Sequence, residues 1–250
     1  MKRLIITIML FFAAPTVSAE LFQKENLMPF SVGYRVNVSR IPTTIKAELT
    51  LAPLGDNRYQ LSLEANSLLL KNKEETAFTW DSCFPHTESY SHYFKGFRRE
   101  RNYQMTFMNE PRRVLNLTHE KKKDSRSKTY LIEDDTLDEL SMMLRARCLI
   151  KPDKTEYEIT TAYGDKLRTH HIRIAGEEEL KTPLGVLNTI RIEKRRHADS
   201  SRSTVFWLAP EMDYMLIRAR HIEAPGLFGE LRMISYEGPF QDKQVSMEER

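Results

Sequence analysis

Alternation of apolar and polar residues with a period of two constrains the fold of this chain more than any other feature. Residues 30–37 show it first, and residues 44–51 and 59–65 repeat it. This period is that of a β-strand with one buried face and one solvated face. Because only short links separate the segments, and Gly55-Asp56-Asn57 is a turn sequence, they predict an antiparallel meander.

Further segments with strand character lie on both sides of one helical stretch. They are residues 76–80, 86–94, 97–107, 113–119, 157–161, 167–174, 186–195, 203–208, 215–223 and 231–236. Turns are expected at residues 164–165, Gly176, 182–185 and 210–213, and the charged run 120–128 is expected to be a solvated hairpin loop. About eleven to thirteen strands predict a mainly β protein with a large curved antiparallel sheet, open or half-barrel-like.

Residues 135–150 are the one stretch with clear helical periodicity. Apolar side chains recur along it at intervals of three and four residues: Leu137, Leu140, Leu144 and Cys148. Thr136 and Glu139 have the spacing of a capping box, and Pro152 would end the helix. We therefore expect one main helix over residues 135–150 that covers the sheet with its leucine face.

The beginning of the chain has the organisation of an export signal. Lys2 and Arg3 precede an apolar run that ends at Ala14, and Val17-Ser18-Ala19 matches a cleavage site. We expect cleavage between Ala19 and Glu20 and a periplasmic location, with an uncleaved anchor as the alternative. The run is shorter than the roughly 20 apolar residues that span a bilayer, and no later stretch qualifies. Residues 20–240 would then form a single antiparallel β domain, and residues 241–250 a polar flexible tail.

The charge of the chain argues against a nucleic-acid partner. The formal net charge is +3 at pH 7, and removal of Lys2 and Arg3 with the signal would leave +1. A nearly neutral chain has little net field to attract phosphates.

The two cysteines, Cys83 and Cys148, predict a disulfide, because an even count in an exported protein favours pairing. Two free, buried thiols are the alternative. A redox pair is disfavoured, since the chain has no Cys-x-x-Cys spacing.

The residues that most often carry chemistry do not form a recognisable site. The histidines are scattered: His86, His92, His119, His170, His171, His197 and His221. Acidic residues cluster at 74–75, 133–135 and 177–179, where solvated turns and caps are the simplest explanation. We therefore predict no catalytic residue, no cofactor and no metal site. A hydrolase of envelope glycans would need two of these acids to meet across a groove.

Several short motifs together resemble an exported bacterial family, domain of unknown function 3108. They are Gly33-Tyr34, the helix pattern of Asp138, Leu140, Ser141, Leu144 and Arg145, the turn Thr182-Pro183-Leu184-Gly185, and Trp207. The sequence departs from the family at Met215, where members often have proline. The resemblance implies a curved antiparallel sheet, similar in layout to the open half-barrels that carry lipoproteins and lipids across the periplasm. It implies no catalytic residues.

These observations favour a binding or carrier protein for a hydrophobic or amphiphilic ligand of the cell envelope, without enzymatic activity. A pocket under the helix would have Leu137, Leu140, Leu144 and Trp207 in its wall. An envelope-assembly factor that binds another protein is the alternative, and a glycan hydrolase is the weaker one. Lipid, lipoprotein or another envelope protein are the expected partners. The sequence does not predict the oligomeric state.

Overall fold

The computed structural model describes residues 27–40, 44–68, 70–96, 99–121, 123–150, 154–195, 197 and 200–241. Within these ranges fifteen strands form one sheet, in the order β8-β7-β6-β5-β4-β3-β2-β1-β15-β14-β13-β12-β11-β10-β9. This confirms the expected mainly β fold with one large antiparallel sheet. The expected signal segment, residues 1–19, and the expected tail beyond Gln241 lie outside the described residues.

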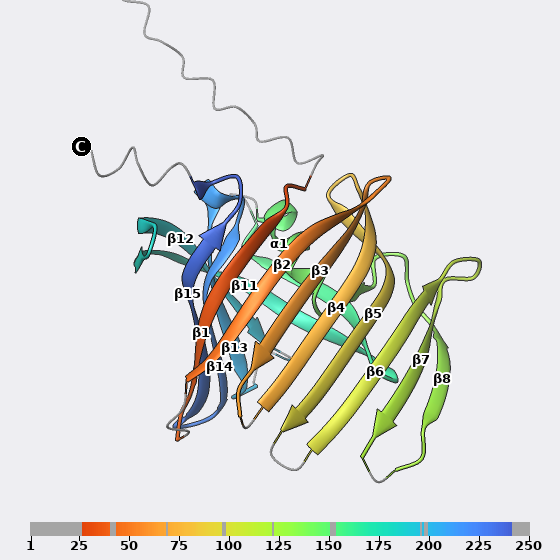
Figure 1. Cartoon of the computed structure of the whole chain (residues 1–250). Coiled ribbons are helices and arrows are strands. Elements are labelled where there is room, and N and C mark those ends of the chain that lie inside the picture. The colour runs from red at the N-terminus through yellow and green to blue at the C-terminus, as the bar shows by residue number, and fades with distance from the viewer. Residues whose placement is uncertain are drawn as a thin grey trace, which may run out of the picture.

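The first half of the chain is a meander that leads away from the centre of the sheet (Figure 1). Its strands are β1 (Phe30–Val38), β2 (Thr44–Gly55), β3 (Arg58–Asn66), β4 (Leu70–Asp81), β5 (Phe84–Gly96), β6 (Arg99–Met108), β7 (Arg113–Glu120) and β8 (Arg126–Leu131). The period-two pattern puts Val32 and Tyr34 on the buried face, where both are fully inaccessible. The charged run 120–128 is only partly a loop, because β7 and β8 extend into it from either side.

The second half returns to the centre, where β15 pairs with β1. Its elements are β9 (Leu137–Asp138), α1 (Met142–Leu149), β10 (Glu156–Tyr163), β11 (Lys166–Thr182), β12 (Gly185–Arg195), β13 (Ser203–Ala209), the 3-10 helix η1 (Pro210–Met212), β14 (Met215–Ala224) and β15 (Leu227–Glu237). The turn at residues 182–185 joins β11 to β12 as expected. Gly176 does not turn the chain, since it lies inside β11 at a break in register between Ile174 and Glu177.

The sheet curls, so that its outer strand β8 approaches the turn between β10 and β11. The Tyr130 hydroxyl donates to the carbonyl of Gly164 at 3.0 Å, and Lys128 Nζ donates to the carbonyl of Asp165 at 2.8 Å. These contacts join the two halves across the interior and leave a half-barrel with α1 inside it (Figure 1). No helix of the described residues combines the length and apolar character that crossing a bilayer requires.

The helix is shorter than expected. It begins at Met142 instead of residue 135, because Leu137 and Asp138 form β9 and pair in parallel with β10. Asp138 fixes this conformation. Its Oδ1 accepts the backbone N–H groups of Leu140 and Ser141 at 2.9 and 2.8 Å. Its Oδ2 accepts the hydroxyls of Thr76 and Thr87 at 2.9 and 2.7 Å. The expected capping box of Thr136 and Glu139 is wrong, because both residues precede α1 and the Glu139 carboxylate contacts Thr161 and His170 instead.

A disulfide holds α1 against the other half of the sheet. Cys83, in the turn between β4 and β5, bonds to Cys148 of α1 with a Cα–Cα separation of 6.1 Å, which confirms the expected pair. Arg145 strengthens the same junction. Its Nη1 donates to the Cys83 carbonyl at 2.6 Å, and its guanidinium lies 5.2 Å from the centre of the Phe84 ring.

Candidate functional site

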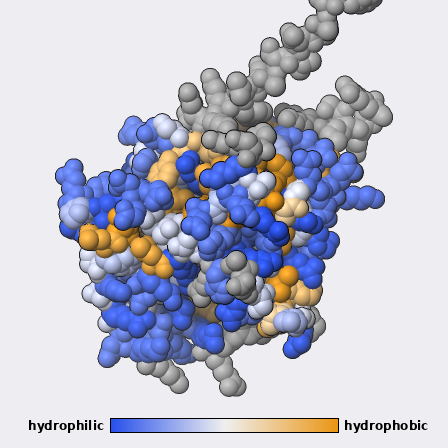
Figure 2. Space-filling model, turned by 180° about the vertical axis from the view of Figure 1, so that it is seen from behind, coloured by the Kyte–Doolittle hydropathy of each residue, from blue (hydrophilic) through white to orange (hydrophobic). Residues whose placement is uncertain are grey.

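An apolar crevice lies beside α1 at one end of the half-barrel. It has a volume of about 100 Å³, and its walls include Leu144 and Leu149 of α1 and Ile192, Phe206 and Leu208 of β12 and β13. Five methionines also line it: Met28, Met142, Met143, Met212 and Met215. From the rear, apolar surface gathers in the upper part of the molecule and hydrophilic residues surround it (Figure 2). The side chains that line the crevice are thus mostly apolar.

The four residues expected in a pocket wall are not brought together. Leu144 lines the crevice, but Leu137, Leu140 and Trp207 are not among its lining residues. Leu137 packs with Met142, and Leu140 joins the main core. Leu137 and Leu140 precede α1, which begins at Met142.

Trp207 has its own surroundings on β13. It neighbours Phe206 in the strand, so the two side chains point to opposite faces. Its indole N–H donates to Glu178 at 2.7 Å, and the Arg218 guanidinium lies 4.5 Å from its ring centre. Trp207 is therefore outside the crevice wall.

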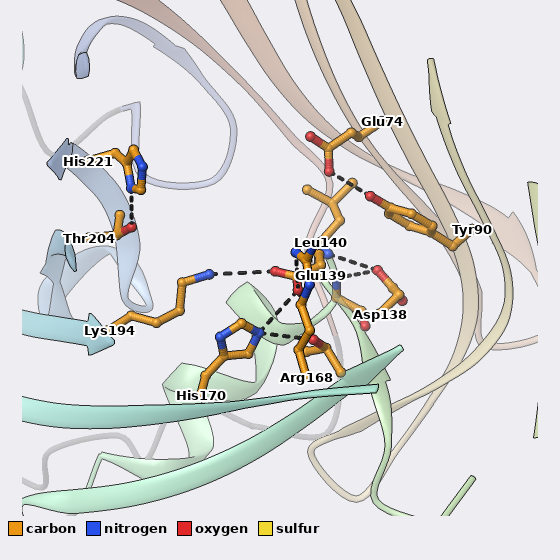
Figure 3. A network of polar contacts seen from close by, with 12 residues as sticks. Glu74, Tyr90, Asp138, Glu139, Leu140, Arg168, His170, Lys194, Thr204 and His221 are labelled. Carbon is orange, nitrogen blue, oxygen red and sulfur yellow. Dashed lines mark hydrogen bonds and ion pairs between the residues drawn. The ribbon is translucent and has the colours of Figure 1, made fainter. Parts of the chain in front are cut away.

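A buried ion network lies next to the crevice, centred on Glu139 (Figure 3). Oε1 of Glu139 accepts the Thr161 hydroxyl at 2.9 Å and lies 3.1 Å from His170 Nε2 and 3.6 Å from Arg168 Nη1. Oε2 lies 3.6 Å from Lys194 Nζ. Burial opposes ionisation of Glu139, but the hydrogen bond from His170 and the charge of Lys194 outweigh it and lower the pKa of Glu139 to about 2.

The network faces a polar cavity of about 600 Å³, which we call the basic cavity. Its walls hold four permanent cations and three histidines against one carboxylate: Arg168, Lys194, Arg195, Arg202, His170, His197, His221 and Glu139. Serines at 200, 201 and 203 and Thr204 complete the wall. Arg195 pairs with Glu193 and Arg202 with Glu223, each at 2.7 Å. The cavity therefore carries a local excess of positive charge around Lys194 and Arg168.

Lys194 lines both the apolar crevice and the basic cavity. Alternation along β12 places Lys194 on the same face as Ile192, while Glu193 faces the other side and pairs with Arg173. The ammonium group lies 5.8 Å from the centre of the Phe206 ring and reaches Glu139 beyond it. The aliphatic stem thus follows apolar surface while the charged end lies among polar groups.

Strands β4 and β5, on the other side of the interior, also carry polar side chains. The Tyr90 hydroxyl donates to Glu74 at 2.9 Å (Figure 3). His92 Nε2 contacts the Asn72 side-chain oxygen at 2.9 Å. Burial lowers the pKa of His92, so its ring is neutral at pH 7. Among the described residues, no three His, Cys, Asp or Glu side chains are placed to hold a metal ion.

Glu139 and Lys194 were not predicted as site residues, for different reasons. Glu139 was expected in a capping box at the start of the helix, and its burial follows only from the unexpected strand β9. Lys194 did leave a signal, because it continues the inward phase of Ile190 and Ile192 by one further step. A lysine at an inward position of a strand indicates a rim or a lined cavity, and here it lines a cavity.

Comparisons with known proteins agree with this architecture. A solved structure titled as a β-barrel-like protein of domain of unknown function DUF1849 from Brucella abortus is similar, with a TM-score of 0.57 and 7% sequence identity. The similarity covers 86% of this chain and 99% of that one, and at this identity it shows the fold alone. A search of curated proteins found no match. The model of the family described as protein of unknown function DUF3108 matches residues 31–233, and the chain therefore belongs to that family.

Proposed function

We propose that this protein is a non-enzymatic binding or carrier protein for a hydrophobic or amphiphilic ligand of the cell envelope. The observation that supports the proposal is the apolar crevice inside the half-barrel, between α1 and strands β12 and β13. A mostly apolar, concave space with a few polar groups at one end is the usual form of a small-molecule site.

The dimensions of the crevice restrict its ligand to a slim chain. Its 100 Å³ is small beside the roughly 300–1,000 Å³ of pockets for drug-sized ligands. Methionine side chains are unbranched and adapt to what they contact, so a wall with five of them can widen along a flexible chain. A single acyl or alkyl chain fits this description better than a ring system does.

The proposal places the protein in the periplasm after cleavage between Ala19 and Glu20. The Cys83–Cys148 disulfide supports an oxidising compartment, because such bonds are rare where thiols are kept reduced. In this proposal the protein meets its ligand in the periplasm.

The two other functions have weaker support. A glycan hydrolase needs a carboxylic acid with a raised pKa as its proton donor, whereas the pKa of Glu139 is lowered to about 2. An assembly factor that adds a strand to a sheet edge would use β8, but Arg126 and Lys128 make that edge charged, and Lys128 is bonded across to Asp165.

The test is binding of the neutral fluorescent probe N-phenyl-1-naphthylamine to purified protein, with and without a block in the crevice. Ile192→Trp fills the crevice and should weaken binding about ten-fold or more, a loss of about 1.4 kcal/mol. Val186→Trp is the matched control, because Val186 is 45% exposed on the same strand and outside the crevice. Circular dichroism checks that both variants are folded. Equal binding by the two variants would overturn the proposal.

Extraction of protein purified from the periplasmic fraction provides the second measurement. Mass spectrometry of the organic extract should show a single-chain amphiphile that the Val186→Trp variant also carries and the Ile192→Trp variant lacks.

A further inference from the structure

We infer that the basic cavity binds the anionic head group of the ligand whose chain lies in the apolar crevice. This inference rests on the proposed function and names the class of ligand: a single-chain amphiphile with a carboxylate or phosphate head. Lys194, which lines both spaces, is the residue at which chain and head group would meet.

The first argument is the uneven charge around Glu139. The Glu139 carboxylate is shared by three basic side chains. It hydrogen-bonds to His170 at 3.1 Å and lies 3.6 Å from both Arg168 and Lys194. Lysine has three donors and arginine five, so one carboxylate at these distances leaves donors over. A second anion beside Glu139 would use them.

The second argument is an unsatisfied donor in the cavity wall. Arg168 Nε is buried and has no hydrogen-bond partner within the described part of the chain. A buried donor without an acceptor is unfavourable, and an anion bound at this guanidinium would offset that cost. Guanidinium groups also match the planar geometry of carboxylate and phosphate oxygens.

The third argument is that the neighbouring wall offers hydroxyls, and that Glu139 is the one carboxylate among the lining residues of the cavity. Thr204 lies opposite Lys194 in the register of β12 and β13, and its hydroxyl contacts His221 Nδ1 at 2.9 Å (Figure 3). Ser203 and Thr204 therefore add donors to the same wall of the basic cavity.

The other charged groups near the crevice are balanced. Arg147 forms an ion pair with Asp213, and both line the crevice. A second polar cavity shares Tyr157 and Ile172 with the crevice, but it has three glutamates, at positions 156, 158 and 193, among its basic residues. Charge complementarity therefore selects the basic cavity for an anion.

The experiment compares ligands with the same fourteen-carbon chain and different heads. Tetradecanoic acid, tetradecyl phosphate and tetradecan-1-ol are titrated against the full mature chain by displacement of the neutral probe at pH 8, and inorganic phosphate is titrated alone by calorimetry. Wild type should bind the two anions about ten-fold more tightly than the alcohol, since one good charge contact is worth about that factor. Inorganic phosphate should bind far more weakly than tetradecyl phosphate.

Variants assign the effect to the cavity. Lys194→Met keeps the apolar stem and should lower affinity for both anions about ten-fold, while affinity for the alcohol changes less than about two-fold. Lys194→Arg should keep the preference for anions. Lys181→Met is the matched control for net charge, because Lys181 is exposed on β11 and lines neither space. Arg168→Gln is the second variant in case Lys194→Met does not fold.

The outcomes separate the two proposals. If the alcohol binds as tightly as the anions and Lys194→Met changes nothing, the head-group inference is overturned and the carrier proposal stands. If none of the chains displaces the probe, the carrier proposal itself fails. If inorganic phosphate binds as tightly as tetradecyl phosphate, the cavity recognises a free anion, and an amphiphile is not its ligand.

Discussion

The ion network around Glu139 should make the stability of the protein depend on pH. Glu139 has its pKa lowered from 4.5 to about 2, with only 14% of its side chain exposed. At about 1.36 kcal/mol per pH unit, this shift corresponds to about 3 kcal/mol. Because the pKa is lower in the folded state, this stabilisation is complete above pH 4.5 or so and is lost as the pH falls toward 2.

Glu139→Gln isolates this contribution. At pH 7 the variant should be less stable than wild type by about 3 kcal/mol, and at pH 3 the difference should shrink to about 1.4 kcal/mol, since part of the carboxylate is then protonated in both states. Glu139→Gln should also raise the affinity for anionic ligands, because it releases Lys194 and Arg168 from their counterion.

Urea unfolding at pH 7, 4 and 3, followed by the fluorescence of Trp80 and Trp207, measures the difference directly. Other paired glutamates, such as Glu193 and Glu230, also have lowered pKa values, and their effect cancels when variant and wild type are compared at one pH. Glu179→Gln, an exposed glutamate on β11, is the control and should be nearly neutral. A difference between wild type and Glu139→Gln that stays constant from pH 7 to pH 3 would refute the reasoning.

Three further substitutions test separate features. Cys83→Ser with Cys148→Ser opens a loop of 65 residues and should cost about 4 kcal/mol in thermal or urea unfolding, while a loss under about 1 kcal/mol would contradict the stabilising role of the bond. Asp138→Asn weakens acceptors for four donors and should cost about 2–3 kcal/mol by urea unfolding, more than the exposed control Asp124→Asn. Trp207→Phe should leave probe binding unchanged, because Trp207 is outside the crevice, and a ten-fold loss would place it in the wall.

The strands were predictable because their signal is local. In β1 and β2 the inward-facing residues are apolar, so the sequence alone identifies them. In the observed register two of them, Val32 and Leu49, lie opposite each other. Gly176 was expected to turn the chain, but a glycine with a φ of 109° suits a bulge inside a strand as well as a turn.

The helix was predictable in position but not in extent. Residues 137–141 have helical spacing, but the hydroxyls of Thr76 on β4 and Thr87 on β5 bind Asp138 and help to hold this segment in another conformation. Those partners are 62 and 51 residues away in sequence, which is beyond any local pattern. The same holds for Glu139, whose role depends on His170 and Lys194 from two other strands.

The pairing of β1 with β15 has a consequence for how the chain acquires its structure. Ser31 lies opposite Glu237, so the central ladder joins residues 206 positions apart. Contacts of such long sequence separation form slowly. A chain delivered amino end first presents β1 with one unpaired edge until nearly its whole length has emerged. During that interval the edge is open to pairing with other chains, and a chaperone that shields it would limit aggregation.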